Sequence, residues 1–260
     1  MQVFIGMPSA TGYPYPEAIF NIVNQTCNKH VDILFDMESL TIRTPIQIAR
    51  NELLDRFLTK TDADYLRFCD DDNPPSVDVL EKLINANKDI VSAIVPLRMW
   101  DREGDLLNIF KYDKQGGREH YTDLSECDES LIEIANCGTW CVLLSREFCE
   151  AMYKAYNKKP FAFETWKYVV GKNEGKVEKY IGQEYDGDWR DKYEEWHDGR
   201  IRVVDIPLSE DVCFFEKAKD LWYTPYAELT AECYHFNGRP SKRKINKRFI
   251  HKEKPCLEQQ

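Results

Sequence analysis

The sequence predicts an α/β fold in which helices flank a mostly parallel central sheet. Over the first hundred residues, short apolar stretches alternate with amphipathic ones, which is the pattern of strand–helix units that build a parallel sheet. Residues 89–95 are almost continuously apolar, as expected of a strand buried on both faces. At 260 residues, with 43% hydrophobic and 31% charged residues, the chain fits one large domain better than two.

The first half of the chain alternates predicted strands with predicted helices. A helix is expected from Pro16, because proline is favoured at the first helical position and apolar residues follow at helical spacing. Apolar residues also recur on one helical face between Ile46 and Phe57, and another helix is expected after Ser76. The strands are short apolar runs bounded by polar or turn-forming residues: 3–7, 30–36, 65–69 and 89–95.

The second half of the chain is less regular. Residues 100–130 predict a hairpin or loop insertion, and residues 157–200 predict a polar, loop-like insertion rich in Trp and Tyr. Those aromatic side chains could stack on sugar rings or bases, or could fix the insertion to the body of the protein. The remaining segments predict strands at 140–144, 201–206 and 226–235 and helices at 145–156 and 209–220.

Charge is unevenly distributed along the chain. The formal net charge of -10 argues against general nucleic-acid binding. Residues 239–254, however, contain eight Lys or Arg and a single acid, Glu253. A basic segment on an acidic body suggests a local anionic target. It could close over a phosphorylated ligand, remain a solvated terminus, or contact nucleic acid or an anionic membrane surface.

The sequence also bears on the cellular compartment. The first residues form a predicted strand instead of a signal peptide, and no apolar stretch approaches the roughly 18 residues that cross a bilayer. The chain has nine cysteines, an odd number, and several of them lie in predicted core segments. A reducing environment is the simplest interpretation. We therefore expect a cytoplasmic protein, with peripheral association at a membrane as the alternative.

Three consecutive aspartates, Asp70, Asp71 and Asp72, follow the predicted strand 65–69. Adjacent carboxylates repel one another, so their proximity costs free energy unless a cation or hydrogen-bond donors compensate. Mg²⁺ and Mn²⁺ prefer oxygen ligands and commonly bind one or two carboxylates together with substrate phosphates. On an extended strand, Asp70 and Asp72 would point the same way and Asp71 the opposite way. The alternative is a solvated acidic turn before the next helix.

Other polar residues follow the ends of neighbouring predicted strands. Pro8 and Ser9 come after the first strand, and Asp36 ends the second. Ligands of open parallel sheets bind beyond the carboxyl ends of the strands. We therefore expect these residues to lie near Asp70 and to be ligand-contact candidates by position.

Residues 68–75, Phe-Cys-Asp-Asp-Asp-Asn-Pro-Pro, resemble the DxD signature of glycosyltransferases with the GT-A fold, near the broad family 2 group. Several further segments resemble this family in order and separation. Residues 209–215 resemble the ED motif that carries the catalytic base in inverting members, and Tyr234-His235 looks like the late metal-binding histidine. The other similar segments are residues 4–9, 38–40, 49–51, 90–98, 136–140 and 145–148.

The resemblance implies a Rossmann-like GT-A domain over residues 1–238. Within it, residues 1–100 would be the nucleotide-binding half. Residues 101–238 would be the acceptor-side half, with a smaller mixed sheet and the insertion at 157–200. Residues 239–260 would form a basic C-terminal segment.

The resemblance also implies a metal-dependent glycosyltransferase of the hexosyltransferase type. It would move a sugar from a UDP- or GDP-sugar to an acceptor hydroxyl with inversion. Asp70, Asp72 and His235 would hold Mn²⁺ or Mg²⁺, although a lone histidine after an apolar strand is often only a hydrogen-bonded core residue. The implied contacts to the nucleotide-sugar donor are Pro8, Ser9, Asp36, Arg50, Asp70, Asp71 and Arg98.

Asp211 would be the catalytic base that takes the proton of the acceptor hydroxyl. Acids in the first turn of a helix can instead stabilise its N-terminus by about 0.3–1 kcal/mol, and this is the role expected for Glu210. Arg50 could reach the donor diphosphate or pair with Glu52 or Asp55 on its own helix.

The acceptor is open at this stage: a saccharide, a glycolipid, a protein or a modified DNA base would each suit the resemblance. A sugar nucleotidyltransferase is a second possibility, but such enzymes usually carry a basic residue in a glycine-rich loop near the N-terminus. Thr11-Gly12 has no nearby Lys or Arg. A non-catalytic sugar- or nucleotide-binding protein is the third.

Overall fold

The computed structural model describes residues 1–10, 12–25, 31–96, 107–112, 118–121, 124, 127–162, 165–171, 177–180, 194–197, 201–207 and 209–234. For residues 165–207, only the backbone of the strands is described. Arg98, His235 and the basic segment 239–260 lie outside the described residues.

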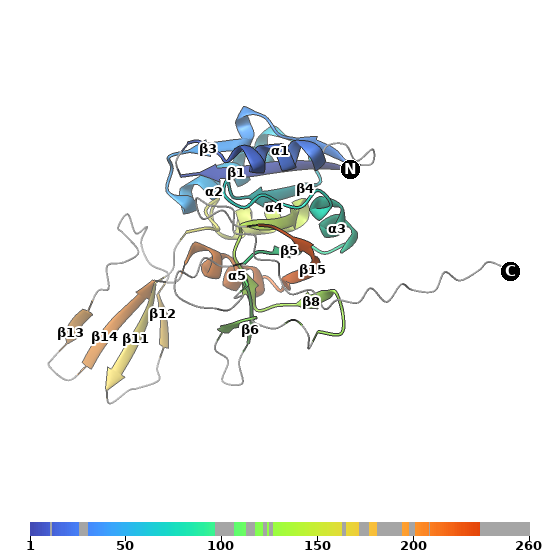
Figure 1. Ribbon diagram of the computed structural model, residues 1–260. Coiled ribbons are helices and arrows are strands. Elements are labelled where there is room, and N and C mark those ends of the chain that lie inside the picture. The colour runs from blue at the N-terminus through green and yellow to red at the C-terminus, as the bar shows by residue number, and fades with distance from the viewer. Residues whose placement is uncertain are drawn as a thin grey trace.

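A large, mostly parallel sheet forms the centre of the molecule (Figure 1). It consists of β1 (Gln2–Ser9), β2 (Asp32–Leu34), β3 (Leu40–Ile42), β4 (Tyr65–Cys69), β5 (Ile90–Ile94), β8 (Leu131–Glu133), β10 (Cys141–Ser145) and β15 (Tyr226–Glu232). The strand order is β2-β1-β4-β10-β5-β15-β8, and β3 also pairs with β1. Only β10 and β8 run against the other strands. The predicted α/β fold with a mostly parallel sheet is confirmed.

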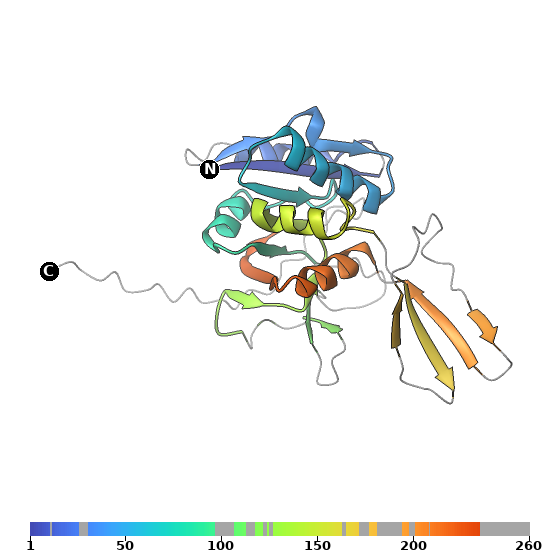
Figure 2. The same cartoon turned by 180° about the vertical axis from the view of Figure 1, so that it is seen from behind.

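Helices cover both faces of this sheet. Figure 1 shows one face, covered by α1 (Pro16–Gln25) and α3 (Val79–Asn85). The view from behind in Figure 2 shows the other, covered by α2 (Ile46–Lys60), α4 (Arg146–Ala155) and α5 (Glu210–Asp220). Each helix buries apolar residues against the sheet, and separate hydrophobic clusters fill the two interfaces. The three-layer arrangement follows because both faces of a parallel sheet are apolar.

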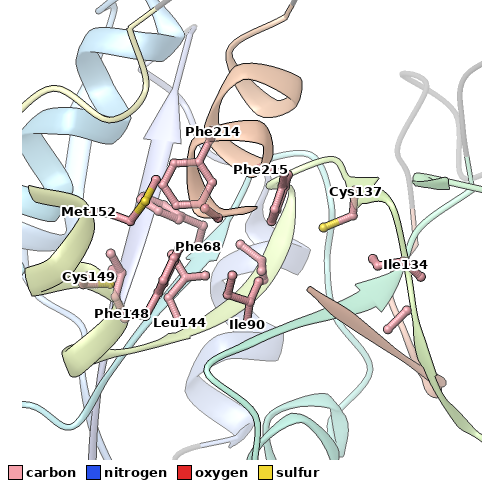
Figure 3. Packing of buried hydrophobic residues seen from close by; sticks show 14 of the residues in the cluster. Phe68, Ile90, Ile134, Cys137, Leu144, Phe148, Cys149, Met152, Phe214 and Phe215 are labelled. Atoms are coloured by element: carbon pink, nitrogen blue, oxygen red, sulfur yellow. The ribbon is translucent and has the colours of Figure 1, made fainter. Parts of the chain in front are cut away.

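Aromatic rings build much of the larger cluster, part of which Figure 3 shows. Phe148 of α4 meets Phe214 of α5 edge to face, with ring centroids 5.7 Å apart. Phe214 also stacks on Phe161 at a centroid distance of 4.1 Å. All five residues of β5 are buried, as its continuous apolar sequence predicts. This packing fixes the N-terminal end of α5 against the sheet, which matters for the site described below.

Two smaller antiparallel sheets lie outside the central one. The first has the order β7-β6-β9, with β6 (Ile109–Tyr112), β7 (Arg118–His120) and β9 (Asn136–Cys137). Its β6–β7 pair is the hairpin predicted within residues 100–130. The second has the order β12-β11-β14-β13, with β11 (Thr165–Gly171), β12 (Val177–Tyr180), β13 (Glu194–His197) and β14 (Ile201–Pro207).

The prediction of a loop-like segment over residues 157–200 is therefore wrong. Residues 165–171 of this segment pair along their whole length with residues 201–207, which include the strand predicted at 201–206. A strand of mixed polar and aromatic residues gives no clear local signal, because its hydrogen-bond partner is distant in the sequence. The smaller sheets are also antiparallel throughout, whereas a mixed one was expected.

The core contains a fully buried arginine, Arg67 of β4. Its Nη1 donates to Oε1 of Gln25 at 2.5 Å, and its Nη2 contacts Sγ of Cys141 at 3.5 Å. Cys69 faces Cys141 across the β4–β10 pair. None of the cysteines among the described residues forms a disulfide.

None of the helices in the described ranges combines the length and the apolar character that a bilayer crossing requires.

Candidate active site

Polar side chains from four elements meet at the carboxyl end of the parallel strands. β1 ends at Ser9, and Asp70 and Asp71 directly follow β4, which is parallel to β1. Ser9 Oγ donates to Oδ2 of Asp71 at 2.5 Å. The predicted convergence of Ser9 with the aspartates is thus observed. α2 and the N-terminus of α5 complete the site.

Arg50 of α2 lies at the centre of this cluster and contacts its carboxylates, and its side chain is 1% exposed. Its Nη1 donates to Oε1 of Glu210 at 2.5 Å and to Oδ1 of Asp211 at 2.7 Å. Its Nη2 lies 3.3 Å from both carboxylate oxygens of Asp70. One guanidinium therefore holds three carboxylates from two distant parts of the chain.

Arg50 cannot neutralise this cluster alone. Burial raises the pKa of Asp70 to about 7, with further raising from Asp211 and Asp72, despite the opposing charge of Arg50. Burial also raises the pKa of Glu210 to about 7, assisted by the adjacent Asp211. The three carboxylates raise the pKa of Arg50 above its ordinary value even though burial acts to lower it. The cluster carries excess negative charge when ionised, and a bound cation would relieve it.

The three aspartates form a turn and do not extend β4. The backbone N–H of Asn73 donates to the carbonyl of Asp70 at 3.2 Å, which closes the turn. The expectation that Asp70 and Asp72 point the same way rests on an extended strand, and the turn removes that basis. Each has its own partner in the described structure: Asp70 binds Arg50, Asp71 binds Ser9, and Asp72 accepts from Nδ2 of Asn73 at 2.8 Å.

The turn offers donor groups that suit a hard divalent cation, although a complete metal site is not described. No three His, Cys, Asp or Glu side chains among the described residues are arranged to hold a metal ion. Oxygen atoms are nevertheless available: Oδ1 of buried Asn73 has no hydrogen-bond partner, next to the carboxylate of Asp72. Carboxylate and amide oxygens are ligands that Mg²⁺ and Mn²⁺ accept.

His235, the third metal ligand implied by the resemblance, lies outside the described residues. The chain just before it runs beside the aspartate turn. The N–H of Tyr234 donates to the carbonyl of Pro74 at 2.9 Å, and Cys233 forms an antiparallel bridge with Pro75. The position of Tyr234 is therefore compatible with a histidine ligand at the next residue.

Asp211 lies at the start of α5, whose N-cap is Ser209, as the sequence predicts. Its Oδ1 accepts from Nη1 of Arg50 and from the hydroxyl of Thr139. Thr139 is buried and lies between β9 and β10. Sequence reasoning missed Thr139 as a partner of Asp211. A short loop residue carries no signal of a contact with a helix that begins seventy residues later.

Three other residues that were given roles from the sequence have surroundings of their own. Glu210 lies in the first turn of α5, as expected of a helix-stabilising acid, and it also pairs with Arg50. Asp36 is the N-cap of the short helix η1 (Met37–Ser39), where its Oδ1 accepts from the N–H of Glu38 at 2.9 Å. Pro8 is buried in β1 and lies opposite Thr41 of β3. Arg98 is outside the described residues.

Comparison with known proteins gives little sequence similarity. No protein-family model matches this chain, and no curated protein matches it. A197 from STIV is 17% identical over 91% of this chain and 86% of its own, with a TM-score of 0.48. A putative glucose-1-phosphate thymidylyltransferase from Bacillus anthracis, solved in complex with a sucrose, is 15% identical over 61% of this chain and 78% of its own, with a TM-score of 0.34. Both TM-scores lie below 0.5, so these similarities do not identify an activity.

Proposed function

We propose that this chain is a glycosyltransferase that moves a sugar from a UDP- or GDP-sugar to an acceptor hydroxyl with inversion. The observation that supports this most is the gathering of Asp70, Glu210 and Asp211 around one buried arginine at the carboxyl edge of a parallel sheet. This is the edge where open α/β sheets bind ligands. The proposal includes a single domain over residues 1–238 and a cytoplasmic location.

The donor would bind through a divalent cation, Mn²⁺ or Mg²⁺, held by Asp70, Asp72 and His235. When bound, such an ion neutralises a diphosphate and stabilises the charge that develops on the leaving group. Ser9 and Asp71 are already hydrogen-bonded to each other at this edge and would contact the nucleotide. Pro8, Asp36 and Arg98 remain donor-contact candidates by position.

Arg50 acts as a positioning residue in this proposal, in place of the phosphate contact considered from the sequence. Its side chain is 1% exposed, and both terminal nitrogens already bind carboxylates. A guanidinium presents its donors in a fixed plane, so it can set the separation between Asp70 on the donor side and Asp211 on the acceptor side.

Asp211 would take the proton from the acceptor hydroxyl as that oxygen attacks the anomeric carbon. Arg50 and Thr139 both bind Oδ1 of Asp211, which fixes the carboxylate plane. We therefore assign Oδ2 to the acceptor hydroxyl. The candidate acceptors are a saccharide, a glycolipid, a protein and a modified DNA base.

The direct test is hydrolysis of UDP- and GDP-sugars in the absence of acceptor, with and without Mn²⁺. Wild-type protein should hydrolyse at least one donor in a metal-dependent way. The same donor, added with Mn²⁺, should raise the melting temperature of the protein by mass action. Asp72→Asn should lose both effects. Asp62→Asn, at an exposed aspartate just before the opposite end of β4, is the matched control and should keep them.

A second variant separates binding from transfer. Asp211→Asn should retain donor stabilisation and lose transfer to an acceptor. Metal-dependent hydrolysis that persists unchanged in Asp72→Asn would remove the assignment of the aspartate turn. Synthesis of a nucleotide sugar from a nucleoside triphosphate and a sugar phosphate would indicate a nucleotidyltransferase instead.

A further inference from the structure

A cavity of about 480 Å³ lies at the end of the sheet opposite the candidate active site. Its lining includes Tyr65, the first residue of β4, whereas Asp70 follows the last residue of the same strand. At about 3.3 Å per residue, these two ends are about 16 Å apart. Tyr226, the first residue of β15, also lines the cavity. The cavity is therefore separate from the carboxylate cluster.

The lining has an unusual composition for a small-molecule cavity. Four of its residues are aromatic: Tyr65, Trp222, Tyr223 and Tyr226. All the others are polar, including Lys88 and Asp89, and none is aliphatic. Most ligand pockets are lined mainly by hydrophobic side chains with a few polar groups. Aromatic faces combined with many hydrogen-bonding groups instead suit a ligand that has both apolar C–H faces and hydroxyl groups.

Trp222 is the most exposed of the large apolar side chains in the described ranges, at 94%. Its backbone is left-handed, with φ of 67°. It follows α5, where the N–H of Trp222 donates to the carbonyl of Lys219 at 2.8 Å and the N–H of Tyr223 donates to that of Ala218 at 3.0 Å. This pair of bonds is the Schellman motif, in which the left-handed position is usually glycine.

Tryptophan at position 222 lowers the stability of the protein without a ligand. A bulky residue with positive φ is strained, and its indole ring gains nothing from burial. Glycine would complete the same helix end without strain. Strained residues persist mainly where a function requires their side chain. The indole of Trp222 is therefore best explained by a ligand that covers it.

The neighbouring groups are already held in place. Tyr223 meets Phe148 of the core edge to face, at a centroid distance of 4.9 Å. Nζ of Lys88 lies 4.4 Å from the ring centroid of Tyr226. Ser145 Oγ donates to Oδ1 of Asp89 at 2.6 Å. Groups fixed before binding lose little conformational entropy when a ligand arrives, which favours even a weak ligand.

We propose that this cavity is a saccharide-binding site at which no reaction takes place. A pyranose ring presents a C–H face that stacks on indole or phenol rings. Its hydroxyl groups would bond with the carboxylate of Asp89 and the ammonium group of Lys88. The site does not depend on the glycosyltransferase assignment, because it shares no residue with the carboxylate cluster.

The test is saturation-transfer NMR and calorimetry on the full chain with three probes: maltotriose, cellobiose and N,N′-diacetylchitobiose. At least one should bind at concentrations up to about 10 mM. Trp222→Gly should weaken that binding about three- to tenfold, the range expected for a lost aromatic contact. It should also raise the melting temperature by about 2–4 °C, because the backbone strain is released.

Two controls separate the indole ring from the backbone and from general exposure. Trp222→Ala should weaken binding without raising the melting temperature, because alanine keeps the strain. Phe20→Ala, at an aromatic residue of α1 that is 65% exposed, should leave binding unchanged. Metal-dependent donor hydrolysis, measured separately, should be unchanged in all three variants.

The proposal is overturned if none of the three probes binds wild-type protein, or if Trp222→Gly binds as tightly as wild type. It is also overturned if sedimentation shows a dimer that Trp222→Ala dissociates, since the indole would then belong to a contact between two copies. None of these outcomes bears on donor hydrolysis at the opposite edge, so failure here is distinguishable from failure of the proposed enzyme activity.

Discussion

Two arginines among the described side chains are almost completely buried, and their surroundings differ in kind. Arg50, on α2, faces three carboxylates at the edge of the sheet. Arg67, in the middle of β4, faces Gln25 and the thiol of Cys141. A buried charge is expensive unless it is paired, so each arginine needs a negative partner. Only the environment of Arg50 supplies more negative charge than it needs.

The positive charge of Arg67 has one ionisable partner, the thiol of Cys141. A hydrogen bond from Cys233 and the charge of Arg67 lower the pKa of Cys141 to about 6, despite burial. Burial raises the pKa of Cys69 and of Cys233, so these two remain neutral. Arg67 thus has one ionisable partner with a lowered pKa, within the core. We infer that the Arg67 cluster serves structure, whereas the excess charge around Arg50 serves the binding of a cation or a substrate.

The largest expected effect comes from Arg50→Met. It leaves three carboxylates in a largely buried site without their cation, and losing one partner of a buried ion pair costs about 3–5 kcal/mol. The free energy of unfolding, measured with urea at pH 8, should fall by this amount, and donor hydrolysis should be lost. At pH 5 the loss should be smaller, because protonation neutralises Asp70 and Glu210. An equal loss at both pH values would show that the carboxylates do not depend on Arg50.

The pH dependence of the wild-type protein is the next test. The pKa of Glu210 is raised in the folded state to about 7 from its ordinary value of 4.5. The folded protein therefore holds more protons than the unfolded chain between these values, and the free energy of unfolding falls as the pH rises from 5 to 8. Glu210 alone should contribute a fall on the order of 3 kcal/mol in urea unfolding without metal ions, and Asp70, whose pKa is also raised to about 7, should add to it.

Glu210→Gln is the control for this pH effect, because a neutral amide of similar size keeps the contact with Arg50. It should reduce the dependence between pH 5 and pH 8 by about half, because Asp70, whose pKa is also raised to about 7, still titrates in this variant. Mn²⁺ should also reduce the fall in the wild type by supplying positive charge near the cluster. A wild-type protein that becomes more stable over this range would contradict the excess charge assigned to the site.

Arg67→Met should have a smaller effect and one confined to stability. Cys141 can hold its proton when Arg67 is removed, so no uncompensated charge stays buried and the cost should be about 2–3 kcal/mol. Hydrolysis per folded molecule should be unchanged, in contrast to Arg50→Met. Urea unfolding combined with a hydrolysis assay below the unfolding midpoint measures both quantities. A loss of activity in the folded Arg67 variant would mean that the two arginines are not separate in function.

A double-mutant cycle should detect the smallest effect. If Arg67 and Cys141 form a pair, the destabilisation by Arg67→Met and Cys141→Ala should be less than additive by about 1 kcal/mol. The four unfolding free energies, measured at pH 8, give this coupling directly. Additive effects would indicate that Arg67 is stabilised by Gln25 alone.

The site illustrates which parts of a protein the sequence can predict. The contact between Ser9 and Asp71 was predictable, because each residue follows a strand that is recognisable from a short local pattern and the two strands end at the same edge of the sheet. The acids in the first turn of α5 could also be predicted from the local sequence. Their pairing with Arg50 could not be predicted, because a contact between residues 160 positions apart leaves no local pattern. The directions of the aspartates were missed because the strand ends at Cys69 and a turn begins.

The same distinction applies to the fold. The strands and helices of the first hundred residues were predicted nearly in full, since each has a strong apolar period. The short strands β3, β8 and β9 were not, because two or three residues cannot establish a period. The sheet formed by residues 165–207 was missed, although its strand at 201–206 was predicted, because strands that pair across a distance in the sequence leave no local pattern.

The position of β10 has a consequence for how this chain is made. β10 inserts between β4 and β5, which precede it in the sequence, and these two strands do not pair with each other. During synthesis from the N-terminus, β4 and β5 therefore each keep at least one unpaired edge until residues 141–145 have emerged. Exposed strand edges invite association with other chains. The growing chain is thus most vulnerable to aggregation on the ribosome shortly before β10 appears, and chaperone demand should peak there.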